Sequence, residues 1–112
     1  ISNLPSMDQR FVEKAIEIVN NNLSNTDFDV KLFAQEMAVS RTQLHRKVTA
    51  ITNKNTSEFI RTIRLNKAAE LLKAKTDNVT QIAYETGFIS LSWFAKSFKE
   101  QYGITPSEYM NS

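Results

Sequence analysis

Apolar residues recur at intervals of three and four along most of the chain, which is the spacing of one face of an α-helix. Only two Gly and two Pro occur in 112 residues, which favours helix over sheet. The pattern therefore predicts an all-α fold. Each expected helix follows a residue that is suited to cap its first turn, and these residues are Ser6, Asp29, Ser40, Asn55, Asn78, Ser90 and Thr105.

The longest expected helix runs from about Thr56 to Lys75, and the pattern that precedes it returns after it. At an offset of 49, the matches pair Val30, Phe33, Ala34 and Glu36 with Val79, Ile82, Ala83 and Glu85. One extra residue then enters the second turn. At an offset of 50, the matches pair Leu44, Val48, Asn53, Ser57, Glu58 and Phe59 with Phe94, Phe98, Gly103, Ser107, Glu108 and Tyr109. This ordered series indicates a duplicated unit.

Each copy follows the plan of a helix-turn-helix motif, with a short helix, a tight turn and a second helix. The turn begins with a small residue, Ala38 or Gly87, and an apolar residue follows it, Val39 or Phe88. In DNA binding the second helix enters the major groove, and residues near its N-terminus meet base edges. The candidate base-contacting residues are Arg41, Thr42, His45 and Arg46 in the first copy, and Leu91, Ser92, Trp93 and Lys96 in the second.

The residue types in these two sets suit different contacts. Arg donates to guanine O6 and N7, and the methyl group of Thr42 suits a thymine methyl. Ser92 and Lys96 can hydrogen-bond. For Trp93 two interpretations are open, namely a surface contact with DNA and partial burial beside Phe94.

The net charge of +2 conceals an uneven distribution of charge. Residues 1–29 carry two basic and five acidic side chains, whereas residues 40–75 carry nine basic and two acidic ones. A concentrated basic segment is a candidate phosphate-binding face, and a solvated helix surface is the alternative. The same alternative holds for Arg64 and Lys67. The predicted phosphate contacts are Lys47, Lys54, Arg61 and Lys99.

No residue pattern points to catalysis, a metal or a cofactor. The chain has no Cys, one His and no Gly-rich phosphate loop. We therefore expect neither an enzyme nor a site for a metal, cofactor or small-molecule substrate. No apolar run is long enough to span a bilayer, and no signal-peptide pattern follows the initial Ile. We expect a cytoplasmic fragment of a longer protein.

The chain resembles the DNA-binding domain of AraC/XylS-type transcription regulators over residues 29–109. The resemblance is carried by Leu32-Phe33-Ala34, Val39-Ser40-Arg41, Leu44, Arg46-Lys47, Ile63-Arg64-Leu65, Ala68-Ala69, Leu71-Leu72, Ile82-Ala83, Gly87-Phe88, Trp93-Phe94, Phe98-Lys99, Gly103-Ile104-Thr105-Pro106 and Tyr109. It implies about seven helices, forming two homeodomain-like helix-turn-helix subdomains joined by a long linker helix. The expected parts are an N-terminal helix and lead-in (1–29), the first subdomain (30–56), the linker (57–76) and the second subdomain (77–112).

The resemblance also implies a function, which is sequence-specific binding of double-stranded DNA. The family's base-contacting positions fall on Thr42, His45, Arg46, Ser92, Trp93 and Lys96, and the two recognition helices read successive major grooves about one helical turn apart. Three residues depart from the family pattern: Asn53 stands where Gly is common, Thr56 where Pro is common, and Met110 where Arg is common.

The N-terminal segment is similar to the lead-in of hybrid two-component regulators, in which one chain joins a sensor, a histidine kinase, a receiver and this output domain. A free-standing regulator with an effector-binding domain and a receiver fused without a sensor are the alternatives. In the hybrid case a sensor region can anchor the full-length protein in the inner membrane. Further partners to test are the receiver or kinase domains of the same chain and RNA polymerase. The alternative function is a protein-interaction module that docks the polymerase or a neighbouring signalling domain.

Overall fold

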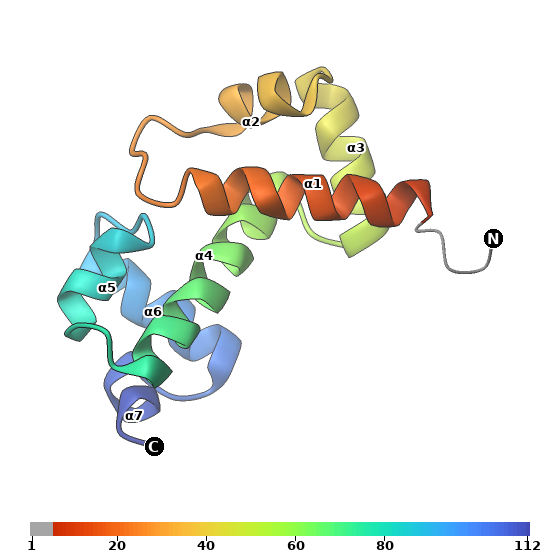
Figure 1. The fold of residues 1–112 in the computed structure, drawn as a ribbon. Coiled ribbons are helices and arrows are strands. Elements are labelled where there is room, and N and C mark those ends of the chain that lie inside the picture. The colour runs from red at the N-terminus through yellow and green to blue at the C-terminus, as the bar shows by residue number, and fades with distance from the viewer. Residues whose placement is uncertain (1–5) are drawn as a thin grey trace. The chain divides into compact units, whose positions relative to one another are not determined.

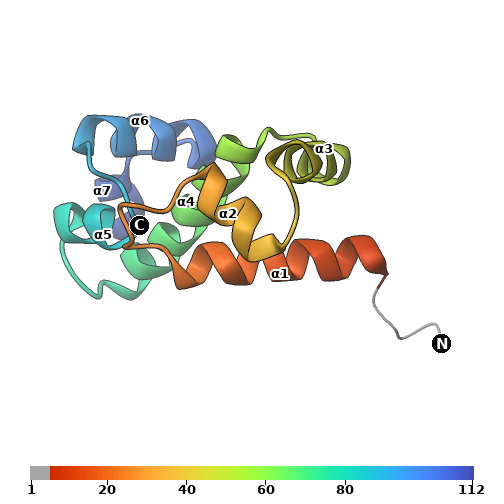
Figure 2. The same cartoon turned by 90° about the horizontal axis from the view of Figure 1, so that it is seen from above.

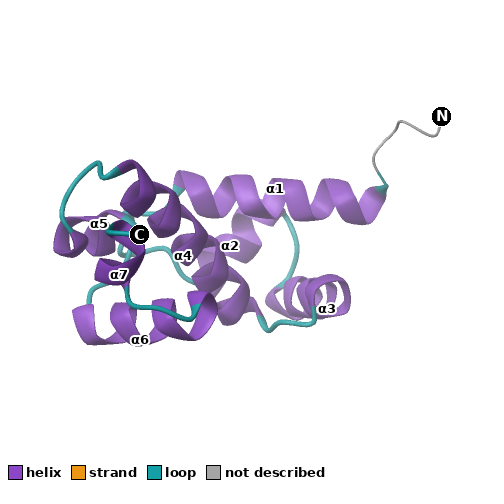
Figure 3. Ribbon diagram, turned by 90° about the horizontal axis from the view of Figure 1, so that it is seen from below, coloured by secondary structure: helices purple, strands orange, loops and turns teal. Residues whose placement is uncertain are grey.

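The computed structural model describes residues 6–112, and this part of the chain contains seven α-helices and no strand (Figures 1 and 3). The predicted all-α fold is thus confirmed. No helix in this range is both long and apolar enough to cross a membrane. The helices are α1 (Met7–Asn21), α2 (Val30–Met37), α3 (Arg41–Thr52), α4 (Thr56–Ala74), α5 (Val79–Glu85), α6 (Leu91–Tyr102) and α7 (Pro106–Met110).

The helices pack as two compact units. The first unit contains Asp27–Ile60 and the described residues up to Asn22. The second contains Leu23–Thr26 and Arg61–Ser112, so the boundary lies inside α4. Each unit therefore holds one complete helix-turn-helix copy, with α2 and α3 in the first unit and α5 and α6 in the second.

The core of the first unit is built around Phe33 of α2, which is fully buried. Its ring stacks on Phe59 at a centroid distance of 6.4 Å and lies 5.7 Å from Phe28. Helix α1 packs against α2 and buries Ala15 and Val19, one helical turn apart. Helix α1 therefore covers α2, and the face of α3 opposite its buried residues stays exposed.

The core of the second unit is a chain of aromatic rings. Phe94 lies 5.0 Å from Phe88 and 5.9 Å from Phe98, measured between ring centroids. Phe98 continues the series to Tyr102 at 4.6 Å and to Tyr109 at 5.3 Å. The three Phe rings and the apolar side of α4, including Leu65 and Leu72, form one buried cluster, and the two partly buried Tyr rings pack against it. This cluster fixes which side of α6 faces inward.

The two copies end their first helix in the same way. In the first copy the N–H of Val39 donates to Ala34 O, and the N–H of Ala38 donates to Gln35 O. In the second, Phe88 donates to Ala83 O and Gly87 to Tyr84 O, at an offset of 49. This is the pair of hydrogen bonds of a Schellman motif, which needs a left-handed residue. Ala38 and Gly87 supply it, with φ of 60° and 93°. The tight turn of the first copy, between α2 and α3, is visible in Figure 1, and that of the second, between α5 and α6, in Figure 2.

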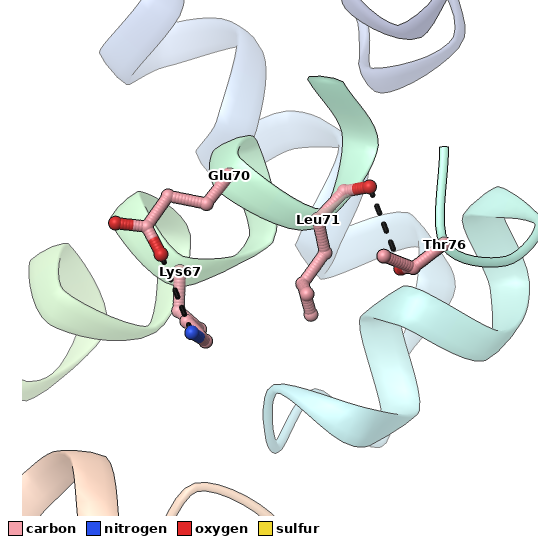
Figure 4. Close-up of polar contacts among 4 residues, drawn as sticks. All are labelled: Lys67, Glu70, Leu71 and Thr76. Atoms are coloured by element: carbon pink, nitrogen blue, oxygen red, sulfur yellow. Dashed lines mark hydrogen bonds and ion pairs between the residues drawn. The ribbon is translucent and has the colours of Figure 1, made fainter. Parts of the chain in front are cut away.

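The ends of the longer helices are closed by local hydrogen bonds. At the end of α4, Lys75 adopts φ of 54°, and the hydroxyl of Thr76 donates to Leu71 O at 3.5 Å (Figure 4). The same view shows Lys67 Nζ paired with Glu70 Oε2 at 3.3 Å. At α7 the predicted cap Thr105 forms a full capping box with Glu108, and the hydrogen bond from the backbone N–H of Thr105 lowers the pKa of Glu108.

The second unit also contains an arginine that is tied to two backbone carbonyl groups. Arg64 Nη1 donates to Leu23 O at 2.5 Å and to Thr86 O at 3.1 Å. Burial lowers the pKa of Arg64 from its ordinary value, although an arginine stays charged at neutral pH. Of the two interpretations that the sequence left open for Arg64, a solvated surface charge is therefore wrong. The side chain joins the loop after α1 to the end of α5.

Candidate nucleic-acid interface

The outer face of α3 carries all four residues that were predicted to contact bases in the first copy. A full capping box starts the helix, because Ser40 accepts from the N–H of Gln43 and Gln43 Oε1 accepts from the N–H of Ser40. Leu44 and Val48 are buried, which turns the opposite side of α3 outward. The exposed residues on that side include Arg41, Thr42, His45 and Arg46.

A shallow hollow lies beside this face, lined by α3 residues, Val30 and the first residues of α4. Thr56 is buried, and its Oγ1 lies 3.5 Å from His45 Nδ1. The N-terminus of α4 thus stands next to the side chains of Arg41, Thr42 and His45. An incoming acceptor would meet three polar side chains, including the cationic Arg41, and a helix N-terminus in one place.

The two predicted phosphate contacts of the first unit differ in their surroundings. Lys47 Nζ lies 4.9 Å from the ring centroid of Phe11, in a cation–π contact with α1. Lys54 is half-buried just after Asn53, which ends α3 with φ of 60°. Asn53 tolerates this left-handed conformation better than most residues, so its departure from the family's Gly is accommodated.

The outer face of α6 carries the corresponding residues of the second copy. Ser90 caps the helix by accepting from the N–H of Trp93 at 3.1 Å. Phe94 and Phe98 turn inward, and the predicted residues Ser92, Trp93 and Lys96 are all exposed. Trp93 keeps 44% of its surface accessible, so part of its ring is covered and the rest is available for a contact with DNA.

The structure brings Arg61 and Trp93 together, although 32 positions separate them in the sequence. Arg61 Cζ lies 5.4 Å from the centroid of the Trp93 ring, which is a cation–π distance. Lys99, the other predicted phosphate contact of this unit, is exposed further along α6. Trp93 therefore has a neighbour that restricts its ring, and Arg61 has a role within the protein besides any contact with phosphate.

Two exposed aliphatic residues lie at the junction of the second turn and α6. Leu91, one of the candidate base-contacting residues, is 40% exposed, and Ile89, which was not among the candidates, is 83% exposed. The alignment of the two copies could have pointed to Ile89, because the offset between them changes from 49 to 50 between Phe88 and Ser90. Ile89 is thus the extra residue of the second turn.

Comparison with known proteins agrees with this geometry. The family described as "Helix-turn-helix domain" matches residues 33–112, which include the second copy and all but the first three residues of the first. A transcriptional regulator from Chromobacterium violaceum, described as containing an AraC-type DNA-binding domain, superposes with a TM-score of 0.83 and 26% identity over 92% of this chain and 91% of that one. The chain belongs to the AraC-type helix-turn-helix family. Domains of this family bind DNA in transcription regulators and are not enzymes.

Two further proteins are similar to this AraC-type domain. The DNA-binding domain of AdpA, a global transcriptional factor solved in complex with a target DNA, has a TM-score of 0.76 and 25% identity over 96% of this chain and 92% of that one. Histidine kinase P4 of Formosa agariphila is 44% identical over 108 residues, or 96% of this chain. The chain spans only 8% of the length of that kinase.

Proposed function

We propose that this AraC-type domain binds a specific double-stranded DNA site with both recognition helices, α3 and α6, and serves as the output domain of a longer bacterial transcription regulator. The observation that carries the proposal is the duplicated motif. In both copies the second helix buries one side and exposes, on the other, the residues predicted to meet bases. These residues lie near the helix N-terminus, where a recognition helix meets base edges.

The first copy has the chemistry of a reader of guanine. Arg41 and Arg46 are exposed on the outer face of α3, and an arginine can donate two hydrogen bonds to guanine O6 and N7. In the proposed complex Thr42 and His45 contact neighbouring bases, and Lys47 and Lys54 contact phosphates. In the second copy Ser92, Trp93 and Lys96 contact bases, and Arg61 and Lys99 contact phosphates.

The proposed setting is a hybrid two-component protein. The 44% identity to a histidine kinase along nearly the whole domain supports it, because that kinase holds a matching segment within a much longer chain. In such a protein, receiver or kinase domains of the same chain would be the partners of this domain, and RNA polymerase would be its partner at the promoter.

The test is selection of binding sites from a pool of random duplexes, repeated for the selected site over a series of salt concentrations. We expect a motif of two blocks about ten base pairs apart, since successive major grooves are about one helical turn apart. We also expect affinity to fall steeply with salt, because phosphate contacts release counterions. Binding that depends on salt but not on sequence would overturn the proposal for the isolated domain.

Arg46→Ala should relax the preference at one base pair of the first block. The expected loss on the selected site is ~1–3 kcal/mol, or roughly 5- to 150-fold, and little change is expected on a site that already carries the wrong base there. Binding titrations of both duplexes by fluorescence anisotropy measure the difference.

Two variants control for charge in this experiment. Arg10→Ala removes the same charge from an exposed position on α1 and should leave the base preference unchanged. Lys99→Ala, at a predicted phosphate contact, should weaken all sequences alike and reduce the salt slope by about one. An Arg46→Ala protein that keeps full preference at every base pair would contradict the assignment of Arg46.

A further inference from the structure

Three large apolar side chains are exposed at the start of α6. Ile89 is 83% exposed, Trp93 44% and Leu91 40%, whereas Phe88 and Phe94, next to them in the sequence, are almost fully buried. Ile89 precedes the N-cap Ser90, and Leu91 is the first residue of the helix. The exposed residues therefore lie at the junction of the turn and the recognition helix of the second copy.

Packing in the core of the unit does not explain why an apolar residue stands at position 89. An apolar residue just before an N-cap often packs on the fourth helical residue, here Phe94. In this unit Phe88 makes that contact instead, at 5.0 Å between ring centroids, and Phe88 is 5% exposed. Ile89 is left with most of its surface in water. An exposed apolar side chain does not stabilise the fold and reduces the solubility of the protein.

The alignment of the two copies shows which residues correspond at this junction. At the offset of 50, Leu91 takes the place of Arg41, and Lys96 takes the place of Arg46. Ile89 has no counterpart, because it is the extra residue of the second turn. The second copy therefore presents two aliphatic groups where the first presents one arginine. If the first copy's arginine meets a polar base edge of DNA, the aliphatic groups of the second copy suit an apolar feature of the DNA.

We propose that Ile89 and Leu91 are specificity-determining residues that read the 5-methyl groups of thymines in the second half of the DNA site. This inference rests on the proposed function. In the major groove the thymine methyl is the one apolar feature of the base edges, and aliphatic side chains recognise it. The occupant is duplex DNA because both residues flank the N-cap of the helix whose N-terminus meets base edges in this motif.

Trp93 has a supporting position in this arrangement. It lies at the third position of α6, where Gln43 of the first copy closes a capping box. An indole cannot accept from the backbone in that way. Trp93 instead meets the guanidinium of Arg61, which places a cation over the ring near the start of α6. Arg61 can therefore contact a phosphate next to the thymines while it restricts the Trp93 ring.

The experiment replaces thymine by deoxyuridine, one position at a time, in the selected duplex. Uracil keeps every hydrogen-bonding group of thymine and lacks only the 5-methyl group. The second block is recognised as the one whose base preference Lys96→Ala relaxes. We expect at least one uracil in that block to weaken binding roughly fourfold, the factor that corresponds to losing one buried methyl group.

The protein variants assign the effect to particular side chains. In Ile89→Ala and Leu91→Ala, the uracil effect at the corresponding position should shrink to less than about twofold. Ile16→Ala is the matched control, because Ile16 is an exposed aliphatic residue on α1 of the other unit, and it should keep the full effect. All three substitutions are at exposed positions, and a thermal melt of each variant verifies that it is folded.

The outcomes separate this inference from the proposed function. A sequence-specific domain that is indifferent to uracil in the second block, or that selects a second block without thymine, overturns the inference and leaves the function standing. A uracil effect that persists in both alanine variants also overturns it. If no sequence is selected at all, both fail. Binding of RNA polymerase that is lost in Ile89→Ala, with the uracil effect absent, would assign the aliphatic pair to a protein partner.

Discussion

Gly87→Ala should lower the free energy of unfolding of the second unit by about 2–5 kcal/mol. Gly87 has φ of 93°, a conformation that costs other residues roughly 1–2 kcal/mol. A Cβ at this position would also fall on Arg64 Nη1 and overlap the carbonyl oxygen of Leu23. Neither can move freely, because the two are hydrogen-bonded to each other, and overpacking of this kind costs about 1–3 kcal/mol more.

Gly103→Ala is the matched control for this effect. Gly103 ends α6 with φ of 83°, and a Cβ there would meet no atom within 4 Å. This variant should lose only the conformational part, roughly 1–2 kcal/mol. Urea unfolding followed by circular dichroism measures both variants. Equal losses would show that crowding at Gly87 contributes nothing, in contradiction to the expected result.

Arg64→Met should destabilise the second unit by about 2–4 kcal/mol. The variant keeps the aliphatic part of the side chain and removes the donors to Leu23 O and Thr86 O. A buried acceptor left without a donor costs about 1–3 kcal/mol, and two acceptors lose their donor here, although water can reach the loop carbonyl in part. The same urea experiment measures the change in the midpoint and in the free energy of unfolding.

Lys67→Met, one turn further along α4, distinguishes this effect from simple loss of a positive charge. Lys67 makes an exposed ion pair with Glu70, and such pairs contribute less than about 1 kcal/mol. We expect a change below about 0.5 kcal/mol. If the two methionine variants were equally stable, the hydrogen bonds of Arg64 would not be important for the fold.

Local chemistry made the helices readable from the sequence. Each N-cap depends on residues three positions apart, and two full capping boxes form, Ser40 with Gln43 and Thr105 with Glu108. The outward position of the predicted base-contacting residues follows from the same short-range pattern. A helix that buries Phe94 and Phe98 must turn Lys96, two residues from each, to the other side.

The contacts of individual charged and aromatic residues could not be predicted in this way. Arg64 binds carbonyl groups 41 and 22 positions away, and Arg61 meets Trp93 from another helix. From composition alone, Arg64 could not be distinguished from the other positive charges of a basic helix. Its partners are backbone atoms, whose positions depend on how the loop after α1 and the end of α5 pack against α4.

The sequence by itself determined the all-helical fold, the caps, the duplication and the AraC-type family, because each rests on residues close together in the chain or on a match between its two halves. The tertiary structure decided which residues are free to meet a partner. Ile89 is exposed because Phe88, the residue before it, fills the space beside Phe94. Burial is a property of the packed unit, and it is settled only when distant side chains compete for the same volume.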